Sequence, residues 1–255
     1  MRSKNDDSCL LNGFFTPEQR ERWMQSLKHR CSCRAYASSP DEDQVAALAI
    51  TAAAVSLPGT RITLMDCPKG FFSGLPFVGR IDGTGKCAVV LRKKNDPFGA
   101  LYAGISGEAF VLEAAAMGLA TCWVAGTYKK AKVRPLCEAG EKIVAVIAVG
   151  VPENPDAPIR KRHPLQRMCG TPPEQWPNWA YQAAEAVRVA PSAVNAQPWH
   201  MNYGHHTLRL NDSKRHMVDD GIAMLHMECA VGSRNHLWTW GKNGCVAHLT
   251  VEDES

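Results

Sequence analysis

The sequence predicts an α+β fold, with helices and strands distributed along the whole chain. The segment 101–119 repeats apolar residues at helical spacing, whereas 142–149 is a continuous apolar run typical of a strand buried on both faces. A second succession of helices and strands follows residue 176 and ends in a β-rich run at 245–251. With 255 residues, 45% of them hydrophobic, the chain can bury such a core as one large domain or as two halves.

The composition argues against several classes of partner. The net charge of +4 is small and no stripe of Lys and Arg interleaves with aromatic residues, so we expect no binding to nucleic acid. No apolar run approaches the ~20 residues that a membrane span requires, so we expect no membrane association. The chain has ten cysteines but starts without a secretory pattern, which predicts a cytoplasmic protein with reduced thiols. Because Cys31 and Cys33 have no second pair at zinc-ligand spacing, we predict no metal site.

Capping patterns predict the first two helices. Thr16-Pro17-Glu18-Gln19 predicts a helix that runs to about Lys28, and Ser39-Pro40-Asp41-Glu42 predicts a second helix that ends before Pro58. Strand-like runs and a helical period then predict the remaining elements of this part, namely strands at 61–65, 87–91 and 142–149 and a helix at 101–119.

The segment 29–36 places two guanidinium groups near a hydroxyl. If the segment is extended, Arg30, Ser32 and Arg34 share one side; if it is helical, the two arginines are i,i+4 neighbours. Either arrangement allows the three side chains to converge on one anion, most naturally a phosphate. A solvated basic turn explains the same residues.

The later part of the chain is organised around the stretch 190–199. Apolar residues at helical spacing precede it: Trp176, Trp179, Ala180, Ala183 and Val187. Pro191 must end that helix, and the proline after Gln197 favours extended geometry at Gln197. The stretch presents Ser192, Asn195 and Gln197, whose hydroxyl and amides suit a neutral heteroaromatic edge such as the pyrimidine side of a flavin. A helix stop followed by a polar turn is the plain alternative.

The remaining elements complete a second half. Strands are predicted at 207–210 and 245–251, and the helical pattern of 219–228 echoes that of 105–116, as a duplication would. We interpret His226 as a structural histidine, because no partner for it can be identified by spacing. With Thr171-Pro172-Pro173 as the predicted hinge, we divide the chain into an N-terminal extension with its helix (1–28), a first half (29–170) and a second half (171–255).

The stretch Ala-Pro-Ser-Ala-Val-Asn-Ala-Gln-Pro-Trp at 190–199 resembles the hallmark of the FMN-dependent nitroreductase superfamily. Its late position is similar to one branch, in which two nitroreductase-like halves are joined in one polypeptide. The run 118–128, Gly-Leu-Ala-Thr-Cys-Trp-Val-Ala-Gly-Thr-Tyr, also resembles that branch. The resemblance covers roughly Lys28 to the C-terminus. It implies a nitroreductase-like fold with two half-domains fused as an intramolecular pseudo-dimer, one FMN site between the halves, and a monomer or weak homodimer.

The resemblance also implies which residues bind the cofactor. Arg30-Cys31-Ser32-x-Arg34 is similar to the family's Arg-Arg-Ser-x-Arg segment, which grips the FMN phosphate and ribityl chain; Cys31 replaces the second arginine. The basic segment after the predicted strand 142–149 would add phosphate contacts; an exposed basic linker is the alternative. Small residues near 125 would allow main chain to approach the isoalloxazine, with a buried helix end as the alternative. The implied FMN-binding residues are Arg30, Cys31, Ser32, Arg34, Val124, Ala125, Gly126, Lys161, Arg162, Pro191, Ser192, Ala193, Asn195 and Gln197.

The activity implied is that of an FMN-dependent NAD(P)H oxidoreductase. The flavin would accept hydride from NADH or NADPH and pass electrons to a small-molecule acceptor in a ping-pong sequence, so we name no catalytic protein acid or base. Three alternatives stay open: a flavin-binding protein without useful turnover, a degenerate relic with a collapsed site, and a thiol enzyme that uses Cys31 or Cys122.

Overall fold

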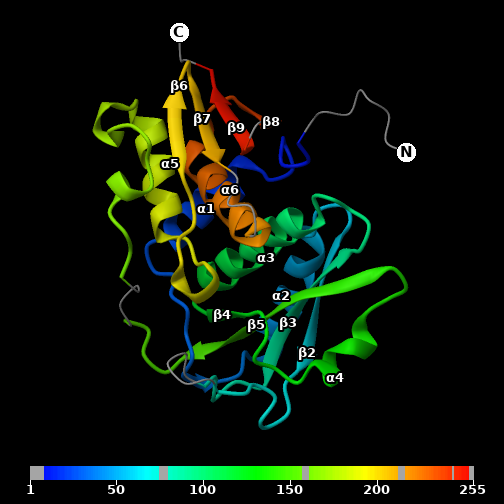
Figure 1. Cartoon of the computed structure of the whole chain (residues 1–255). Coiled ribbons are helices and arrows are strands. Elements are labelled where there is room, and N and C mark those ends of the chain that lie inside the picture. Colours follow the sequence, from blue (N-terminus) through cyan, green and yellow to red (C-terminus); the bar gives the residue numbers. More distant parts are fainter. Residues whose placement is uncertain (1–8, 75–79, 157–160, 212–215, 243, 253–255) are drawn as a thin grey trace. The chain divides into compact units, whose positions relative to one another are not determined.

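The computed structural model describes residues 9–74, 80–156, 161–211, 216–242 and 244–252, and the chain forms two compact units (Figure 1). The middle unit is Gln25–Lys161, and the terminal unit joins Met1–Met24 to Arg162–Ser255. The units divide after Met24 and after Lys161, whereas we divided the sequence after residues 28 and 170, and Thr171-Pro172-Pro173 lies inside the terminal unit. The division into an extension and two halves stays a prediction.

The middle unit is a five-stranded antiparallel sheet with helices. Its strands are β1 (Tyr36–Ser38), β2 (Thr60–Asp66), β3 (Lys86–Lys93), β4 (Ala120–Val124) and β5 (Glu141–Pro152), in the order β1-β5-β3-β2 with β4 also paired to β5. Its helices are α2 (Glu42–Ala54), α3 (Gly99–Ala116), the short α4 (Lys130–Val133) and the 3₁₀ turn η1 (Arg134–Leu136). The predicted strands and helices of this part are therefore present, and β1 and β4 are added to them.

Strand β5 lies at the centre of that sheet, and both of its faces are covered. Val146 and Ala148 belong to a cluster of buried residues that also includes Tyr36, Phe71 and Phe72. The alternate residues of β5 are buried as well, and α3 packs against β2, β3, β4 and β5. A strand buried on both faces needs an apolar side chain at every position, which is why its sequence reads as a continuous apolar run.

The helix caps confirm one sequence prediction and correct another. At α1 (Pro17–Ser26) the Thr16 hydroxyl accepts from the Gln19 N–H and the Gln19 side chain accepts from the Thr16 N–H, as predicted. At α2 the capping box is Asp41 with Gln44, two residues later than the predicted Ser39 with Glu42. The Ser39 hydroxyl instead accepts a hydrogen bond from the Gly85 N–H, 2.8 Å away.

The terminal unit contains the second sheet. Its strands β6 (Met201–Gly204), β7 (Thr207–Asn211), β8 (His236–Trp240) and β9 (Cys245–Val251) pair antiparallel in the order β6-β7-β9-β8. Helices α5 (Asn178–Val189) and α6 (Met217–Val231) pack against each other, and 3₁₀ turns stand at η2 (Leu165–Arg167), η3 (Pro173–Gln175) and η4 (Ala193–Asn195). The sequence predicted β7, β9 and both long helices but missed β6 and β8.

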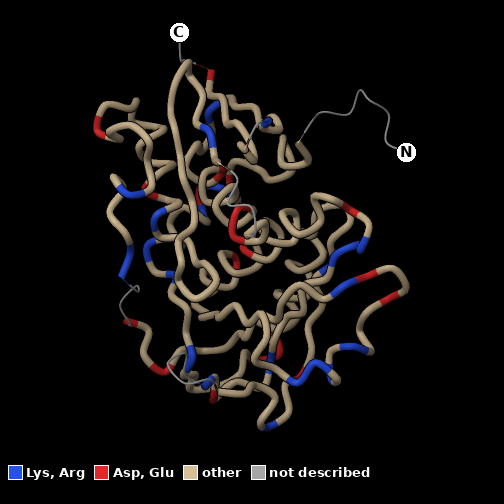
Figure 2. Tube along the Cα trace, in the orientation of Figure 1, with Lys and Arg blue, Asp and Glu red and all other residues tan. Residues whose placement is uncertain are grey.

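A buried carboxylate ties the terminal unit together. Charged residues of both signs are interspersed along the chain (Figure 2), yet Glu228 of α6 is fully buried. Its Oε1 lies 3.1 Å from Arg20 Nη1, and its Oε2 accepts from the Trp238 indole N–H at 2.7 Å and lies 2.9 Å from His236 Nε2. Burial alone would lower the pKa of His236, but the hydrogen bond and attraction to Glu228 raise it. The carboxylate therefore joins α1, α6 and β8.

We expect Glu228→Gln to lower the free energy of unfolding by about 3 kcal/mol, because it leaves the buried Arg20 guanidinium without its countercharge. Chemical denaturation monitored by circular dichroism measures this change. The control is Glu185→Gln, which breaks the partly exposed pair that Glu185 forms with Arg188 and should cost less than about 1 kcal/mol. Equal losses in the two variants would contradict the assignment.

Candidate functional site

The stretch 190–199 forms a tight loop after α5. The helix ends at Val189, as Pro191 predicted, and a 3₁₀ turn follows. Three non-glycine residues then take left-handed backbone conformations, Val194 with φ 48°, Asn195 with φ 58° and Gln197 with φ 50°. The predicted extended geometry at Gln197 is therefore wrong. Local hydrogen bonds outweigh the preference before proline: the Gln197 N–H donates to the Ser192 hydroxyl at 2.9 Å, and its side-chain amide donates to the Asn195 carbonyl at 3.2 Å.

The polar groups of this loop bind Arg162 and His163, the first residues of the second stretch of the terminal unit. Arg162 Nη1 donates to Asn195 Oδ1 at 2.6 Å, and Arg162 Nη2 donates to the Val189 carbonyl at 3.1 Å. One residue later, the His163 N–H donates to Gln197 Oε1 at 2.7 Å. The structure therefore brings together four of the predicted site residues: Arg162, Ser192, Asn195 and Gln197. Of the other predicted residues here, Pro191 is buried, and Ala193 and Lys161 are exposed.

Asp219 fixes the loop 190–199 by hydrogen bonds, a role that the sequence did not reveal. This buried residue lies in the first turn of α6, where its Oδ1 accepts from the Ala193 N–H at 3.1 Å and its carbonyl accepts from the Trp199 indole N–H at 2.9 Å. Burial raises the pKa of its carboxyl, although the Ala193 N–H and the nearby His216 act to lower it. An acidic residue at a helix start is common, so the sequence alone could not single this one out.

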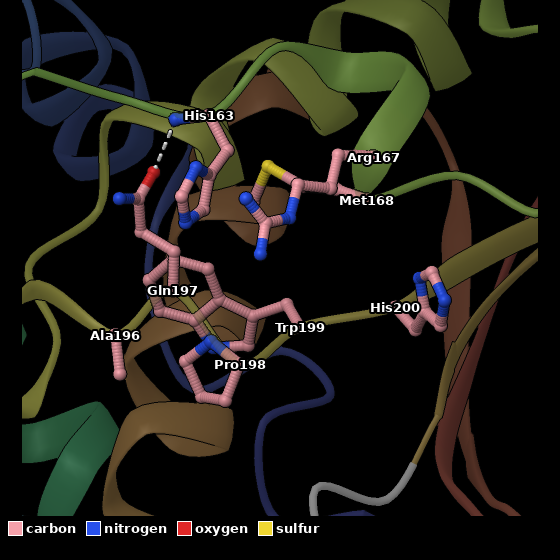
Figure 3. A pocket seen from close by; sticks show the side chains of 8 residues that line it. All are labelled: His163, Arg167, Met168, Ala196, Gln197, Pro198, Trp199 and His200. Atoms are coloured by element: carbon pink, nitrogen blue, oxygen red, sulfur yellow. Dashed lines mark hydrogen bonds between the residues drawn. The ribbon is translucent and has the colours of Figure 1, made fainter.

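A hollow of about 200 Å³ lies beside the loop within the terminal unit (Figure 3). It is lined by His163, Arg167, Met168, Ala196, Gln197, Pro198, Trp199 and His200. Gln197 is shared between the hollow and the network that holds Arg162 and His163. The walls of the hollow therefore come from two segments that are hydrogen-bonded to each other.

The segment 30–34 is extended, one of the two conformations that the sequence allowed. Ser32 pairs with Thr121 in a parallel bridge, and the Cys33 N–H donates to the Thr121 carbonyl at 2.9 Å. Arg30 is only 4% exposed, and its Nε lies 3.9 Å from Glu108, which also accepts from the Trp123 indole N–H at 2.8 Å. Arg30 is thus directed into the interior of the middle unit.

The other residues of this segment are more accessible than Arg30. Cys31, Ser32 and Arg34 are half-buried. Within the described part of the chain, no hydrogen bond or ion pair of the Arg34 guanidinium is found, while its carbonyl accepts from the Asp82 N–H at 3.0 Å. Arg34 is therefore the guanidinium of this pair that is placed to reach a ligand.

The run 118–128 is a turn followed by strand β4, so its interpretation as a buried helix end is wrong. Helix α3 already ends at Ala116, because Gly118 takes a left-handed conformation with φ 77° and the chain then enters β4. Val124 is buried at the end of the strand, and the small residues Ala125 and Gly126 are exposed in the turn that follows. The bridge between Ser32 and Thr121 places this strand beside the segment 30–34.

Comparison with known proteins identifies the family. Residues 22–231 match the model of the family described as "Putative TM nitroreductase". The chain belongs to this nitroreductase family. It is accordingly a nitroreductase-family oxidoreductase with the α+β fold that the resemblance implied.

The solved structure of one relative agrees with the nitroreductase fold. A "putative nitroreductase" of Thermotoga maritima is 20% identical, with 91% of this chain and 94% of that chain covered and a TM-score of 0.65. A "putative nitroreductase" of Desulfovibrio desulfuricans, solved in complex with FMN, is 16% identical over 61% of this chain and 98% of that chain, with a TM-score of 0.46. No curated protein matches the chain.

Three further observations bear on this nitroreductase-family chain. The described residues contain no group of three or more His, Cys, Asp or Glu placed to hold a metal ion. In the same residues, no helix has the length and apolarity needed to cross a bilayer. His226 is buried, and its Nδ1 lies 2.8 Å from the Ala186 carbonyl, which agrees with its interpretation as a structural histidine.

The left-handed backbone at Val194 generates a stability prediction. Val194 is 88% exposed, so a substitution there loses almost no packing, and asparagine tolerates the left-handed region better than a β-branched residue. We expect Val194→Asn to raise the free energy of unfolding by about 1 kcal/mol. Ile50→Asn is the control, because Ile50 is 73% exposed but lies in the right-handed helix α2; it should stay within about 0.5 kcal/mol of wild type. A destabilised Val194→Asn in chemical denaturation would contradict this conformation.

The cysteines generate a prediction about reactivity. Burial raises the pKa of the Cys122 thiol, although Arg34 acts to lower it, and the residue is only 3% exposed. We therefore expect iodoacetamide to label half-buried Cys31 before Cys122 in the native protein, as peptide mass spectrometry would show. Preferential labelling of Cys122 would instead favour a thiol enzyme that uses Cys122.

Proposed function

We propose that this nitroreductase-family oxidoreductase binds one FMN non-covalently and reduces a small acceptor with electrons from NADH or NADPH. The observation that carries the proposal is the loop 190–199, which holds Ser192, Asn195 and Gln197 in a fixed, partly left-handed arrangement. Such a backbone persists only where its surroundings impose it, and this occurs most often at binding sites.

The residues of the middle unit fit the phosphate end of the cofactor. Arg34 supplies an accessible guanidinium and Ser32 a half-buried hydroxyl, which together suit a phosphate and the adjacent polyol chain. Arg30 fits direct contact poorly because it is buried near Glu108; we propose that it positions the segment instead. Cys31 stands where the family has arginine, so Arg34 carries the larger part of the charge.

The small residues after β4 fit the flat ring of the cofactor. Ala125 and Gly126 are exposed, so main chain could approach an isoalloxazine there without obstruction by a large side chain. Val124 is buried and holds the strand end in place.

In the terminal unit, the half-buried Ser192 and Asn195 and the exposed Ala193 fit the pyrimidine edge. Pro191 and Gln197 are buried and shape the loop, whereas Arg162, together with Lys161 at the end of the middle unit, adds positive charge that favours an anionic cofactor.

When bound, FMN supplies the redox chemistry, accepting hydride from a nicotinamide and delivering electrons to the acceptor in separate half-reactions. The protein's part is to bind the cofactor, orient its ring and exclude competing reactions. We further propose that the protein works in the cytoplasm, since all ten cysteines are free thiols, and that it is a pseudo-dimeric monomer or a weak homodimer.

The test is cofactor retention. Purified protein is mixed with excess FMN, desalted, and examined by its visible spectrum; about one flavin per chain should remain bound. Arg34→Gln should weaken FMN binding about tenfold or more, because a charge-assisted contact to phosphate is lost. The control is Arg134→Gln, which removes the same charge from an exposed position in the same unit and should leave FMN affinity unchanged.

Each outcome of this test has a clear meaning. Loss of flavin on desalting by wild-type protein would contradict the proposal and favour a degenerate site. Retained flavin that neither NADH nor NADPH reduces would leave a flavin-binding protein without turnover. Unchanged affinity in Arg34→Gln would remove Arg34 from the site.

A further inference from the structure

The hollow beside Trp199 is lined by several hydrogen-bond donors and by no carboxylate. Of the eight residues that line it, Arg167 carries a guanidinium, His163 and His200 carry imidazoles, and none is Asp or Glu. Arg167 is exposed, and no hydrogen bond or ion pair of its guanidinium is found among the described residues. In Figure 3, His163 and Arg167 extend into the hollow from one wall, while His200 belongs to the opposite one. The hollow therefore presents hydrogen-bond donors suited to a negatively charged group.

The floor of the same hollow is apolar. Its accessible apolar surface comes from Ala196, which is exposed, and Pro198, which is half-buried, whereas Met168 and Trp199 are almost wholly buried. The Trp199 indole N–H already donates to the Asp219 carbonyl, so it is not offered to a ligand. A ligand that fills this space must combine an anionic group with a hydrophobic body.

The two walls are fixed to each other at both ends. Near one end, the His163 N–H donates to Gln197 Oε1 at 2.7 Å. Near the other, the Met201 N–H donates to the Met168 carbonyl at 2.7 Å, and the Gly170 N–H donates to the Met201 carbonyl at 2.9 Å. Binding would therefore require little ordering of the backbone, which favours affinity for a small ligand.

We propose that this hollow binds a small aromatic carboxylate. A guanidinium can pair with both oxygens of a carboxylate, and the imidazoles can donate further hydrogen bonds. An inorganic phosphate would satisfy the donors but leave the apolar surface of Ala196 and Pro198 uncovered, whereas an aromatic ring would cover it. A volume of about 200 Å³ is smaller than the pockets that hold drug-sized ligands, so it suits a ligand of the size of benzoate. This site lies within the terminal unit, and of its eight lining residues only Gln197 is also a predicted FMN-binding residue.

The experiment is a titration of the full-length chain with benzoate, followed in ¹H–¹⁵N spectra. Saturable shifts are expected at the Trp199 indole N–H and the Gln197 side-chain amide, because both residues line the hollow. Benzamide, a neutral molecule of nearly the same shape, should bind about tenfold more weakly, since it cannot form a charge-assisted pair. Benzamide binding as tightly as benzoate would overturn the proposal. So would inorganic phosphate binding as tightly with the same shifts.

Two variants locate the binding. Arg167→Gln should weaken benzoate binding about tenfold, and His200→Asn should weaken it by a smaller factor. The matched control is Arg188→Gln, which removes an arginine of the same unit that pairs with Glu185 away from the hollow and should leave benzoate affinity unchanged. The dispersion of the spectrum reports whether each variant is folded. Wild-type affinity in folded Arg167→Gln, or an equal loss in Arg188→Gln, would contradict the assignment. Because benzoate binding is measured without FMN, its result is separate from that of the flavin test.

Discussion

Each unit depends on one buried carboxylate of its long helix, because that charge must be surrounded by hydrogen-bond donors. Glu108 of α3 and Glu228 of α6 are both fully buried, and each accepts a hydrogen bond from a tryptophan indole and lies close to an arginine. A charge in such a position destabilises the fold unless donors surround it, so the donors must be brought to it. In the terminal unit this requirement holds α1 and β8 against α6; in the middle unit it holds Arg30 and β4 against α3. The segments that carry the predicted cofactor residues of the middle unit are the ones fixed in this way.

Most helices and strands could be predicted because local sequence determines them. The apolar period of α3, the continuous apolar run of β5 and the proline after α5 act over a few residues. The cap of α2 shows where this reasoning stops. Both Ser39 and Asp41 have a carboxylate or amide three residues later, so the sequence offers two registers. The hydrogen bond from the Gly85 N–H to Ser39, a contact 46 residues away, leaves Asp41 as the cap.

The candidate site, too, could be predicted only where local sequence determines it. Ser192, Asn195 and Gln197 could be recognised as a polar edge, because their side chains and spacing are visible in the sequence. Their attachment to Arg162 and His163 could not, since those partners lie about thirty residues away and pair only in the folded unit. The interior position of Arg30 depends in the same way on Glu108, and the role of Asp219 depends on its hydrogen bond with the loop 190–199.

The loop 190–199 also indicates which role the protein has and which role its proposed cofactor has. Val194 and Gln197 each cost about 1–2 kcal/mol relative to a relaxed backbone, and Asn195, which lies between them, costs less because asparagine tolerates the left-handed region. The hydrogen bonds that Ser192 and Asp219 accept and the one that Arg162 donates offset that cost and keep the loop in one conformation. A loop held in this way before ligand binding loses little further entropy when a ring docks against it. If the redox chemistry resides in the flavin, the protein must contribute a fixed polar edge. Selection would then act on the residues that hold the loop as strongly as on those that touch the ring.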